Sequence, residues 1–501
     1  MLSWLKKHYL KVIFVFFLIA LFFISRLIRL TQIPLFVDEA IYLRWAQIAK
    51  GDAAWRFISL TDGKQPLFIW LVMISLRFFA DPLFAGRVVS VFVGLLSMIG
   101  LFLLGKEISR KTSVGLLSSL LYLIYPFALV YDRMVLMDGL VGMFAIWALY
   151  FEILLAKHRR LDLALLLGMI MGGSMLTKSS GFFNLYLLPF SVVLYKCRKK
   201  LWKKDLLLLS GLMVVAVVES QMIYALLRLS PFFHIVAEKN TVFIYPFAEW
   251  RLHPWQFFRG NLSGLINWFV GYFSWPWIIL LLVSFIAEMK LWKEKGLLFL
   301  WFAIPFVGLA LFGKVLFPRF IFSMTLSLLP LVALALDWGY GLLKKKIYFL
   351  ILIMLFFAPV LVKDYQLLTN PYVADIPKAD KDQYMNQWPA GGGIKEAVAF
   401  FNEQAKIGSI FVGTEGTFGL LPHGLEIYLG QNTNIEIKGY WPIKAQIPEE
   451  VLLKAEKEPT FFVFNQTQPE KVPAGWPIKL IAKYRKGVGD IYLQIYRVLP
   501  Q

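Results

Sequence analysis

The stretch Phe36-Val37-Asp38-Glu39-Ala40-Ile41-Tyr42 closely follows an apolar run, Tyr9 to Ile28, that is long enough to cross a bilayer as a helix. Two adjacent carboxylates at the mouth of a membrane helix are costly unless they have a partner or a role. Lys6 and Lys7 precede the apolar run, and no small-residue cleavage site follows it. The sequence therefore predicts a retained signal anchor with a cytoplasmic N-terminus.

The composition is that of a membrane protein. Of 501 residues, 58% are hydrophobic and 17% are aromatic, whereas soluble domains are about 45–50% apolar. The net charge of +20 could suit nucleic acid. The basic residues, however, form short clusters beside helix ends, and no long basic face argues for nucleic-acid binding. The single cysteine, Cys197, cannot form an internal disulfide, and it falls in a predicted cytoplasmic cluster.

Basic clusters set the orientation of the predicted spans, because Lys and Arg collect on the cytoplasmic side. The clusters are Lys106/Arg110/Lys111, Lys157/Arg159/Arg160, Lys196 through Lys204, Lys290/Lys293/Lys295 and Lys344/Lys345/Lys346. They predict eleven crossings, at 9–30, 83–104, 113–131, 135–156, 161–177, 181–195, 205–228, 264–289, 296–313, 319–341 and 346–362. The protein would be a multi-pass protein of the plasma (inner) membrane, with its C-terminal portion extracytoplasmic.

The apolar segment Leu67 to Ala80 is the doubtful element of this topology. Counted as a span, it would invert every later loop. It is short, carries Arg77 and is followed by Asp81-Pro82. We expect a helix that lies in the membrane interface or is partly re-entrant, within a first outer loop of residues 31–82.

The composition changes after about Lys363. A polar linker, 363–390, leads to Gly391-Gly392-Gly393 and a region of soluble character, 391–501. The triple glycine lacks the strand–glycine–helix spacing of a phosphate-binding loop, which favours a hinge. Helices are expected over 394–405 and 449–457, and strands over 409–413, 461–464, 478–484 and 490–498. The predicted fold is thus a polytopic α-helical module, residues 1–362, with an extracytoplasmic α/β domain.

Several charged residues allow more than one interpretation. Asp38 and Glu39 fit an ordinary helix start, where acidic side chains are favourable. Lys64 and Arg319, each taken alone, favour ordinary interface anchors, and Asp132-Arg133 can form a local ion pair. Asp138 is different, because it lies in an otherwise uncharged apolar span and needs a partner or a role. His253 reads as a loop histidine, and no residues have zinc-ligand spacing.

Six patches, in sequence order, resemble one known family. The patches are Val37-Asp38-Glu39-Ala40-Ile41-Tyr42, Gly63-Lys64-Gln65-Pro66-Leu67, Arg87-Val88-Val89-Ser90, Asp132-Arg133-Met134-Val135-Leu136-Met137-Asp138, Leu176-Thr177-Lys178 and Pro318-Arg319-Phe320. They resemble bacterial members of the dolichyl-phosphate-mannose–protein mannosyltransferase-like superfamily, which also contains the aminoarabinose transferases. These are membrane glycosyltransferases of the GT-C fold. The likeness covers about the first 340 residues.

The resemblance implies an inverting transfer of a sugar from a polyprenyl-phosphate-linked donor, on the extracytoplasmic face. Asp38 would be the catalytic carboxylate, with Glu39 beside it. Cations near the outer helix ends would stabilise the charge that develops on the leaving lipid phosphate. The candidates for this role are Lys64, Arg87, Arg133, Lys178 and Arg319. Asp138 and Tyr42 would structure the site.

The departures from the family pattern limit what it implies. Gln65 replaces the first proline of a Pro-Pro pair. Gly63 stands where the aminoarabinose transferases carry an acidic residue thought to help hold a metal, so a divalent metal is not supported, although Asp62 could substitute. No other cofactor is expected. The C-terminal region lacks β-trefoil repeats, which leaves a lipid, a glycan or a protein as the acceptor.

Two other functions are compatible with a polytopic chain. A transporter or flippase of polyprenyl-linked glycans predicts paired half-helices or inverted repeats, and the sequence shows neither. A non-catalytic membrane scaffold predicts that intramembrane charges are dispensable, and Asp138 argues against that.

Overall fold

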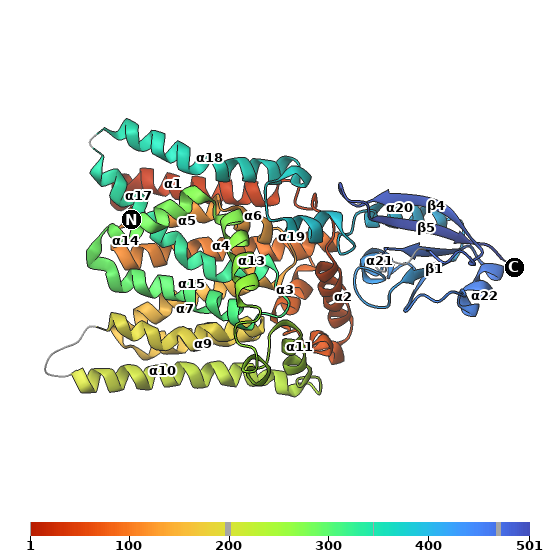
Figure 1. Cartoon of the computed structure of the whole chain (residues 1–501), viewed down its shortest axis with the longest axis horizontal. Helices are drawn as coiled ribbons and strands as arrows, with labels where there is room; N and C mark the ends of the chain where they lie inside the picture. Colours follow the sequence, from red (N-terminus) through yellow and green to blue (C-terminus); the bar gives the residue numbers. More distant parts are fainter. Residues whose placement is uncertain (1, 196–201, 344, 467–471, 501) are drawn as a thin grey trace. The chain divides into compact units, whose positions relative to one another are not determined.

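The computed structural model describes residues 2–195, 202–343, 345–466 and 472–500 (Figure 1). Cys197 and most of the predicted basic cluster around it lie outside these ranges. The chain forms two compact units. Unit 1 consists of Met1–Ile28, Phe57–Phe68 and Val88–Pro377, and unit 2 consists of Arg29–Arg56, Ile69–Arg87 and Lys378–Gln501. The segment that carries Asp38 is therefore part of the same unit as the C-terminal domain.

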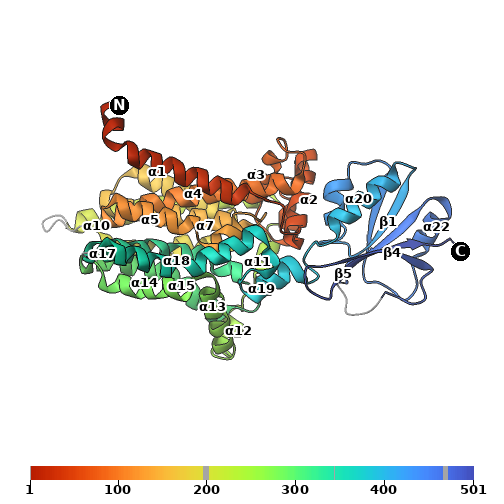
Figure 2. The same ribbon diagram turned by 90° about the horizontal axis from the view of Figure 1, so that it is seen from above.

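Unit 1 is a bundle of helices that run side by side (Figures 1 and 2). Its helices are α1 (Leu2–Leu27), α4 (Pro82–Ser109, which begins in unit 2), α5 (Thr112–Leu123), α6 (Pro126–Tyr131), α7 (Met137–His158), α8 (Leu161–Met175), α9 (Phe183–Leu187), α10 (Trp202–Tyr224), α11 (Ile235–Phe243), α12 (Phe247–Trp250), α13 (Phe258–Phe273), α14 (Trp275–Ile286), α15 (Trp292–Phe312), α16 (Phe322–Thr325), α17 (Leu329–Leu342) and α18 (Lys346–Thr369). Short 3₁₀ turns used below are η2 (Ile58–Asp62), η3 (Ser179–Phe182), η4 (Leu188–Leu194) and η7 (Pro318–Ile321).

Each of the eleven predicted ranges is largely helical, but the described helices are not equally long. Six are long and apolar enough to cross a membrane, and the bent pair α13 and α14 makes up to seven. Four others are shorter apolar helices: Ile13–Leu27, Thr112–Leu123, Leu161–Met175 and Ser179–Leu194. The chain is a multi-pass membrane protein with six or seven full-length candidate spans, fewer than the eleven expected.

The predicted span 264–289 is broken rather than continuous. Its two helices meet at 97°, and Ser274 between them has a φ of 67°. Pro276 follows at the start of α14, and a proline there cannot donate the hydrogen bond that would continue the preceding helix. The local sequence therefore explains the bend.

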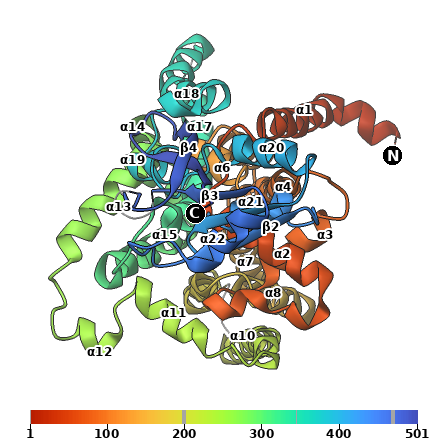
Figure 3. The same cartoon turned by 90° about the vertical axis from the view of Figure 1, so that its right-hand side faces the viewer.

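Helix packing in unit 1 uses small residues where helices approach closely. α8 carries Gly168-x-x-x-Gly172, and a Cβ at Gly168 would lie 2.9 Å from the carbonyl oxygen of Ala216 on α10. A Cβ at Gly172 would lie 2.7 Å from the Cβ of Ile223. This spacing is typical of membrane helices in close contact, and α8 and α10 lie side by side in Figure 3.

Unit 2 contains a five-stranded mixed sheet in the order β2-β1-β3-β5-β4. Its strands are β1 (Ile410–Glu415), β2 (Ile435–Tyr440), β3 (Thr460–Phe464), β4 (Ile478–Arg485) and β5 (Tyr492–Val498). β1 is parallel to β2 and β3, and β5 is antiparallel to β3 and β4. The predicted helices and four predicted strands are confirmed within a few residues, whereas β2 was not predicted.

Helices cover both faces of this sheet, and successive side chains of β3 pack against one layer and then the other. Phe461 contacts Phe400 and Phe401 of α20 (Ile394–Ala405). Its neighbour Phe462 packs on the opposite face with Trp476, in a core that includes Val451 of α22 (Glu449–Lys457). Successive side chains of a strand point to opposite faces, so one strand anchors both layers.

Within unit 2, helix α2 of the first loop attaches to the sheet domain. α2 (Val37–Gly51) packs against α21 (His423–Leu429), a helix that the sequence did not predict. Arg44 donates to Glu426 at 3.0 Å, and the Gln47 amide donates to the carbonyl of Ile427 at 2.8 Å. α3 (Leu67–Ser75) is nine residues long, too short to cross a bilayer. Two short helical turns, α19 (Lys378–Lys381) and a π turn (Asp382–Asn386), precede α20.

Candidate active site

The acidic pair Asp38-Glu39 forms the first turn of α2, and its two members differ sharply. Asp38 is partly exposed, whereas Glu39 is fully buried. Glu39 Oε2 accepts a hydrogen bond from the backbone N–H of Phe36 at 2.9 Å. The carboxylate thus satisfies one of the backbone donors at the helix start, and it lies where the helix dipole favours negative charge. The helix-start interpretation holds for Glu39.

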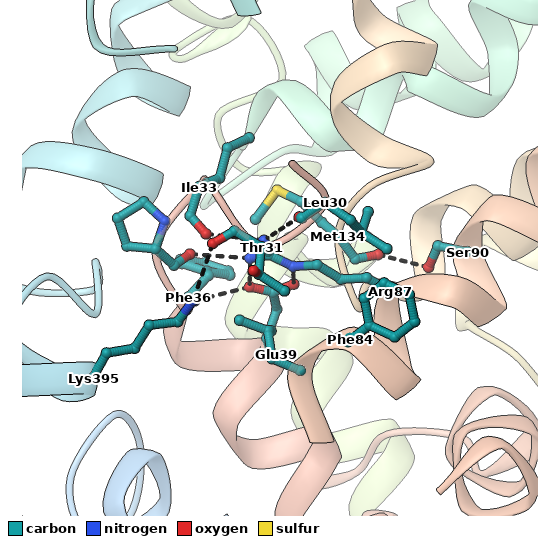
Figure 4. A network of polar contacts seen from close by, with 12 residues as sticks. Leu30, Thr31, Ile33, Phe36, Glu39, Phe84, Arg87, Ser90, Met134 and Lys395 are labelled. Carbon is teal, nitrogen blue, oxygen red and sulfur yellow. Dashed lines mark hydrogen bonds and ion pairs between the residues drawn. The ribbon is translucent and has the colours of Figure 1, made fainter. Parts of the chain in front are cut away.

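Glu39 also forms a two-pronged ion pair with Arg87 (Figure 4). Arg87 Nε donates to Oε1 at 2.9 Å, and Arg87 Nη2 donates to Oε2 at 2.7 Å. Both side chains have no exposed surface. The other Arg87 donors reach the carbonyls of Leu30, Ile33 and Pro34, at 2.9, 2.9 and 3.1 Å.

This network changes the roles expected for two predicted residues. Glu39 is enclosed with its oxygens already hydrogen-bonded, so the geometry does not support a catalytic role in proton transfer. Arg87 is enclosed by a carboxylate and three carbonyls, so the geometry does not support direct binding of the donor phosphate. Together they fix the chain before α2 to the helix itself, which positions the neighbouring Asp38.

Tyr42 lies one turn after Asp38, on the same face of α2. Its side chain is only 5% exposed, and its ring stacks on Trp45 with centroids 5.9 Å apart. Trp45 in turn contacts Phe418 of the sheet domain at 6.0 Å. These contacts fit the predicted site-structuring role of Tyr42, which would act through packing.

The linker before the sheet domain pairs with the start of α2. The backbone N–H of Val37 donates to the carbonyl of Pro389 at 3.0 Å, and that of Gly391 donates to Leu35 at 2.6 Å. A Cβ at Gly391 would lie 2.4 Å from the Leu35 oxygen, so only glycine permits this approach. The first glycine of the triple is therefore required by close packing, and the predicted hinge is a fixed junction here.

A buried lysine holds this linker in place. The Lys486 ammonium donates to the carbonyls of Trp388 and Ala390, at 2.9 and 2.7 Å, and to Asn465 Oδ1. Burial lowers the pKa of Lys486 to about 7, although the charge of Glu415 opposes the shift. Lys486 was not predicted, since nothing in the local sequence marks a lysine in a hairpin turn as buried.

In unit 1, the Lys64 patch is joined to the Lys178 patch. The backbone N–H of Leu67 donates to the carbonyl of Leu176 at 3.0 Å. The Gln65 amide donates to the hydroxyl of Ser179 at 2.9 Å. Gln65, which departs from the family pattern, thus has a defined contact. Two patches more than a hundred residues apart in sequence form one local structure.

Asp138, a carboxylate that is nearly buried, has a cationic partner. Its carboxylate binds the Lys178 ammonium at 2.6 Å, and the two side chains are 9% and 27% exposed. The same ammonium lies 4.7 Å from the ring centroid of Phe320, which adjoins Arg319 in η7. A cation over an aromatic face is favourable. Three of the six sequence patches therefore meet at Lys178.

The described contacts join Asp132 and Arg133 to other groups rather than to each other. Arg133 is 2% exposed and donates to the carbonyl of Ile28 at 2.8 Å. Asp132 binds Arg26 at 3.2 Å and accepts from the Tyr122 hydroxyl at 2.7 Å. Arg26 was not predicted. An arginine near the end of an apolar run is the signal that could have found it.

Lys64 lies beside an acidic residue and a further lysine. Asp62 accepts from Lys239 of α11 at 2.6 Å and lies 3.5 Å from Lys64. Lys239 was not among the predicted residues. The described residues contain no group of three or more His, Cys, Asp or Glu side chains that could hold a metal ion.

Comparison with solved structures identifies the architecture. The crystal structure of ArnT from Cupriavidus metallidurans bound to undecaprenyl phosphate matches with a TM-score of 0.62 and 17% identity, over 99% of this chain and 100% of that chain. The chain has the GT-C fold. The apo state of the same protein matches with a TM-score of 0.59 and 16% identity, over the same shares. The archaeal oligosaccharyltransferase AglB from Archaeoglobus fulgidus, in complex with an inhibitory peptide and a dolichol-phosphate, is more distant. It has a TM-score of 0.48 and 13% identity, over 92% of this chain and 70% of that chain.

Residues 63–224 of this GT-C chain match the family model described as dolichyl-phosphate-mannose-protein mannosyltransferase. Among curated proteins, no sequence matches significantly. The matched segment contains most of the predicted site. Inside it lie Lys64, Arg87, Arg133, Asp138 and Lys178, and outside it lie Asp38, Glu39, Tyr42 and Arg319.

Proposed function

We propose that this GT-C protein is an inverting glycosyltransferase that moves a sugar from a polyprenyl-phosphate-linked donor to an acceptor hydroxyl on the extracytoplasmic face. The observation that carries the proposal is the difference in burial between Asp38 and Glu39. Glu39 and Arg87 form a rigid, buried support, and Asp38 next to them remains partly exposed on a fixed helix. A carboxylate held in this way is suited to act on a substrate. The solved relative bound to undecaprenyl phosphate supports the choice of donor.

In the proposed reaction, Asp38 accepts the proton of the acceptor hydroxyl as the oxygen attacks the anomeric carbon of the sugar. The bond between that carbon and the phosphate oxygen breaks, and polyprenyl phosphate leaves with the bonding electrons. Lys64, Lys178 and Arg319 are the cations proposed to stabilise the leaving phosphate. Arg133 is retained as a candidate, although its guanidinium is nearly enclosed.

The acceptor is proposed to reach Asp38 through the sheet domain. α2 packs on α21 and pairs with the linker at Pro389–Gly391, so the helix that carries Asp38 is built into that domain. A lipid, a glycan or a protein acceptor would then bind a surface that is continuous with the catalytic helix. A glycan transporter or a scaffold needs no such attachment of an exposed carboxylate.

The test is release of polyprenyl phosphate from radiolabelled polyprenyl-phosphate sugars by purified protein in nanodiscs. We compare wild type, Asp38→Asn and the matched control Asp52→Asn, which changes an exposed carboxylate that caps a turn in the same loop. We expect Asp38→Asn to lose about 10²–10⁴-fold in rate, the usual range for a general base. Asp52→Asn should retain the wild-type rate.

The outcomes separate the candidate functions. If donor is consumed equally by all three proteins, Asp38 is not the catalytic carboxylate. If labelled donor crosses the bilayer intact and no donor is consumed, a transporter is favoured and the glycosyltransferase proposal fails.

A further inference from the structure

The turn that carries Lys64 is built around a glycine that cannot be replaced. Gly63 has a φ of 64°, in the left-handed region. A Cβ there would lie 2.6 Å from the carbonyl oxygen of Ile235 and 2.6 Å from the Cβ of Lys239. Both contacts are closer than real Cβ atoms allow. Helix α11 therefore packs directly on the turn, and no acidic side chain can stand at position 63.

The neighbouring acid already holds two cations. One carboxylate oxygen of Asp62 lies 2.6 Å from the Lys239 ammonium, and the other lies 3.5 Å from the Lys64 ammonium. The three side chains are 18–28% exposed. The group of two ammoniums and one carboxylate carries a net charge of about +1 and is reachable from solvent.

These residues do not fit a divalent metal ion. The aminoarabinose transferases are expected to place an acidic residue at the position of Gly63. Here that side chain is absent and its space is filled by α11. Asp62 could ligate a metal only after giving up both lysines, and a metal prefers several oxygen or imidazole ligands in one place. The donor set therefore argues for a different source of positive charge.

We propose that Lys239 supplies that charge: its ammonium binds the phosphate of the polyprenyl lipid beside Lys64, at the turn where the family resemblance implies an acidic metal ligand. The inference rests on the proposed function for its choice of ligand. An ammonium has three N–H donors, and Asp62 accepts one hydrogen bond from it among the described contacts. The remaining donors suit phosphate oxygens, which lysine binds as a point charge.

The position of Lys239 does not depend on its charge. Val236, three residues earlier on α11, is 4% exposed and packs in a hydrophobic cluster with Leu60, Leu176 and Leu227. This cluster fixes α11 against the Lys64 turn. Replacing Lys239 by methionine removes the ammonium and keeps a side chain of similar length, so the helix should remain in place.

The experiment measures binding of undecaprenyl phosphate, without a sugar, to the full-length protein in detergent by native mass spectrometry. Wild type, Lys239→Met, Lys239→Arg and Lys111→Met are compared, each with and without EDTA. Lys111→Met is the matched control, since it removes an ammonium that is paired with acids elsewhere, Glu288 and Asp337. Turnover of sugar donors is followed in the same preparations.

We expect wild type to bind equally with and without EDTA. Lys239→Met should bind about tenfold or more weakly, as expected for loss of a hydrogen bond to a charged group. Lys239→Arg and Lys111→Met should bind within a few-fold of wild type. Binding that EDTA abolishes and a divalent metal restores would overturn the inference, as would a Lys239→Met protein that binds like wild type. If binding follows the expected pattern but no donor is turned over, the glycosyltransferase proposal fails and the phosphate site stands.

Discussion

Substitution of Glu39 by glutamine tests whether the buried pair with Arg87 supports α2. The glutamine keeps the shape of the side chain but removes its charge, and its amide NH₂ would face the guanidinium. Arg87 would then remain fully buried without a counter-charge. Breaking a buried ion pair by removing one partner destabilises by about 3–5 kcal/mol. We therefore expect a loss of that size in the local stability of α2.

Hydrogen exchange of the α2 amides, measured by mass spectrometry, reports this local free energy. It suits a protein of two compact units better than a single global unfolding curve, which assumes two-state behaviour. Protection of residues 37–51 should fall about a hundredfold or more, given that about 1.4 kcal/mol is a factor of ten. Donor turnover should fall with it, because Asp38 lies on the same turn.

The matched control is Glu426→Gln, in helix α21, which packs against α2. Glu426 pairs with Arg44 of α2 at 3.0 Å, and these side chains are 19% and 27% exposed. Pairs that water reaches contribute about 0–1 kcal/mol. An equal loss of α2 protection in the two variants, or unchanged protection in Glu39→Gln, would show that the buried pair does not support α2.

Two further predictions concern other buried charges. The pKa of Lys486 is about 7 in the folded protein and about 10.4 in an unfolded chain. Between these values the unfolded state holds more protons, so the stability of the sheet domain should rise with pH by at most about 1.4 kcal/mol per unit and level off outside this window. Thermal unfolding from pH 6 to 11 should show this rise in wild type, and Lys486→Met should lack it; parallel curves would contradict the assignment. For the Asp138–Lys178 pair, Asp138→Asn and Lys178→Met should be non-additive in kcat/KM for donor cleavage, with a coupling of about 0.5–3 kcal/mol. Additive effects would show that the pair does not act as one unit.

Hydropathy and periodicity predicted most helices and strands, because the pattern of buried residues in each is present in its own stretch of sequence. The eleven apolar ranges are helical, and α22 begins and ends where the sequence predicted, at Glu449 and Lys457. α21 escaped prediction because it is a seven-residue helix, and helices this short are stabilised by packing rather than by their own sequence. β2 carried a usable signal, the alternation of Ile435 and Ile437 with charged residues, which fits an edge strand.

Motif spacing found the candidate residues but could not assign their partners. Glu39 pairs with Arg87, 48 positions later, and Asp132 pairs with Arg26, 106 positions earlier. From the sequence patches alone, Asp132 was expected to pair with Arg133, and Arg87 was expected to bind the donor phosphate. Ion pairs over such separations depend on which helices pack together, and this information is not present in any one patch.

Because Asp38 and Glu39 are adjacent, one motif can both hold α2 in place and supply the proposed catalytic carboxylate. Successive residues on an α-helix point about 100° apart, so two neighbouring carboxylates cannot both face the same surroundings. Glu39 points into the unit and is neutralised by Arg87, which removes an uncompensated like charge from beside Asp38. Glu39 also accepts from the Phe36 amide, so the residue that fixes the helix start is the immediate neighbour of the proposed base. A carboxylate without this support would move with the loop, whereas the helix that carries Asp38 is held by the buried Glu39–Arg87 pair and by the hydrogen bond from the Val37 N–H to the Pro389 carbonyl.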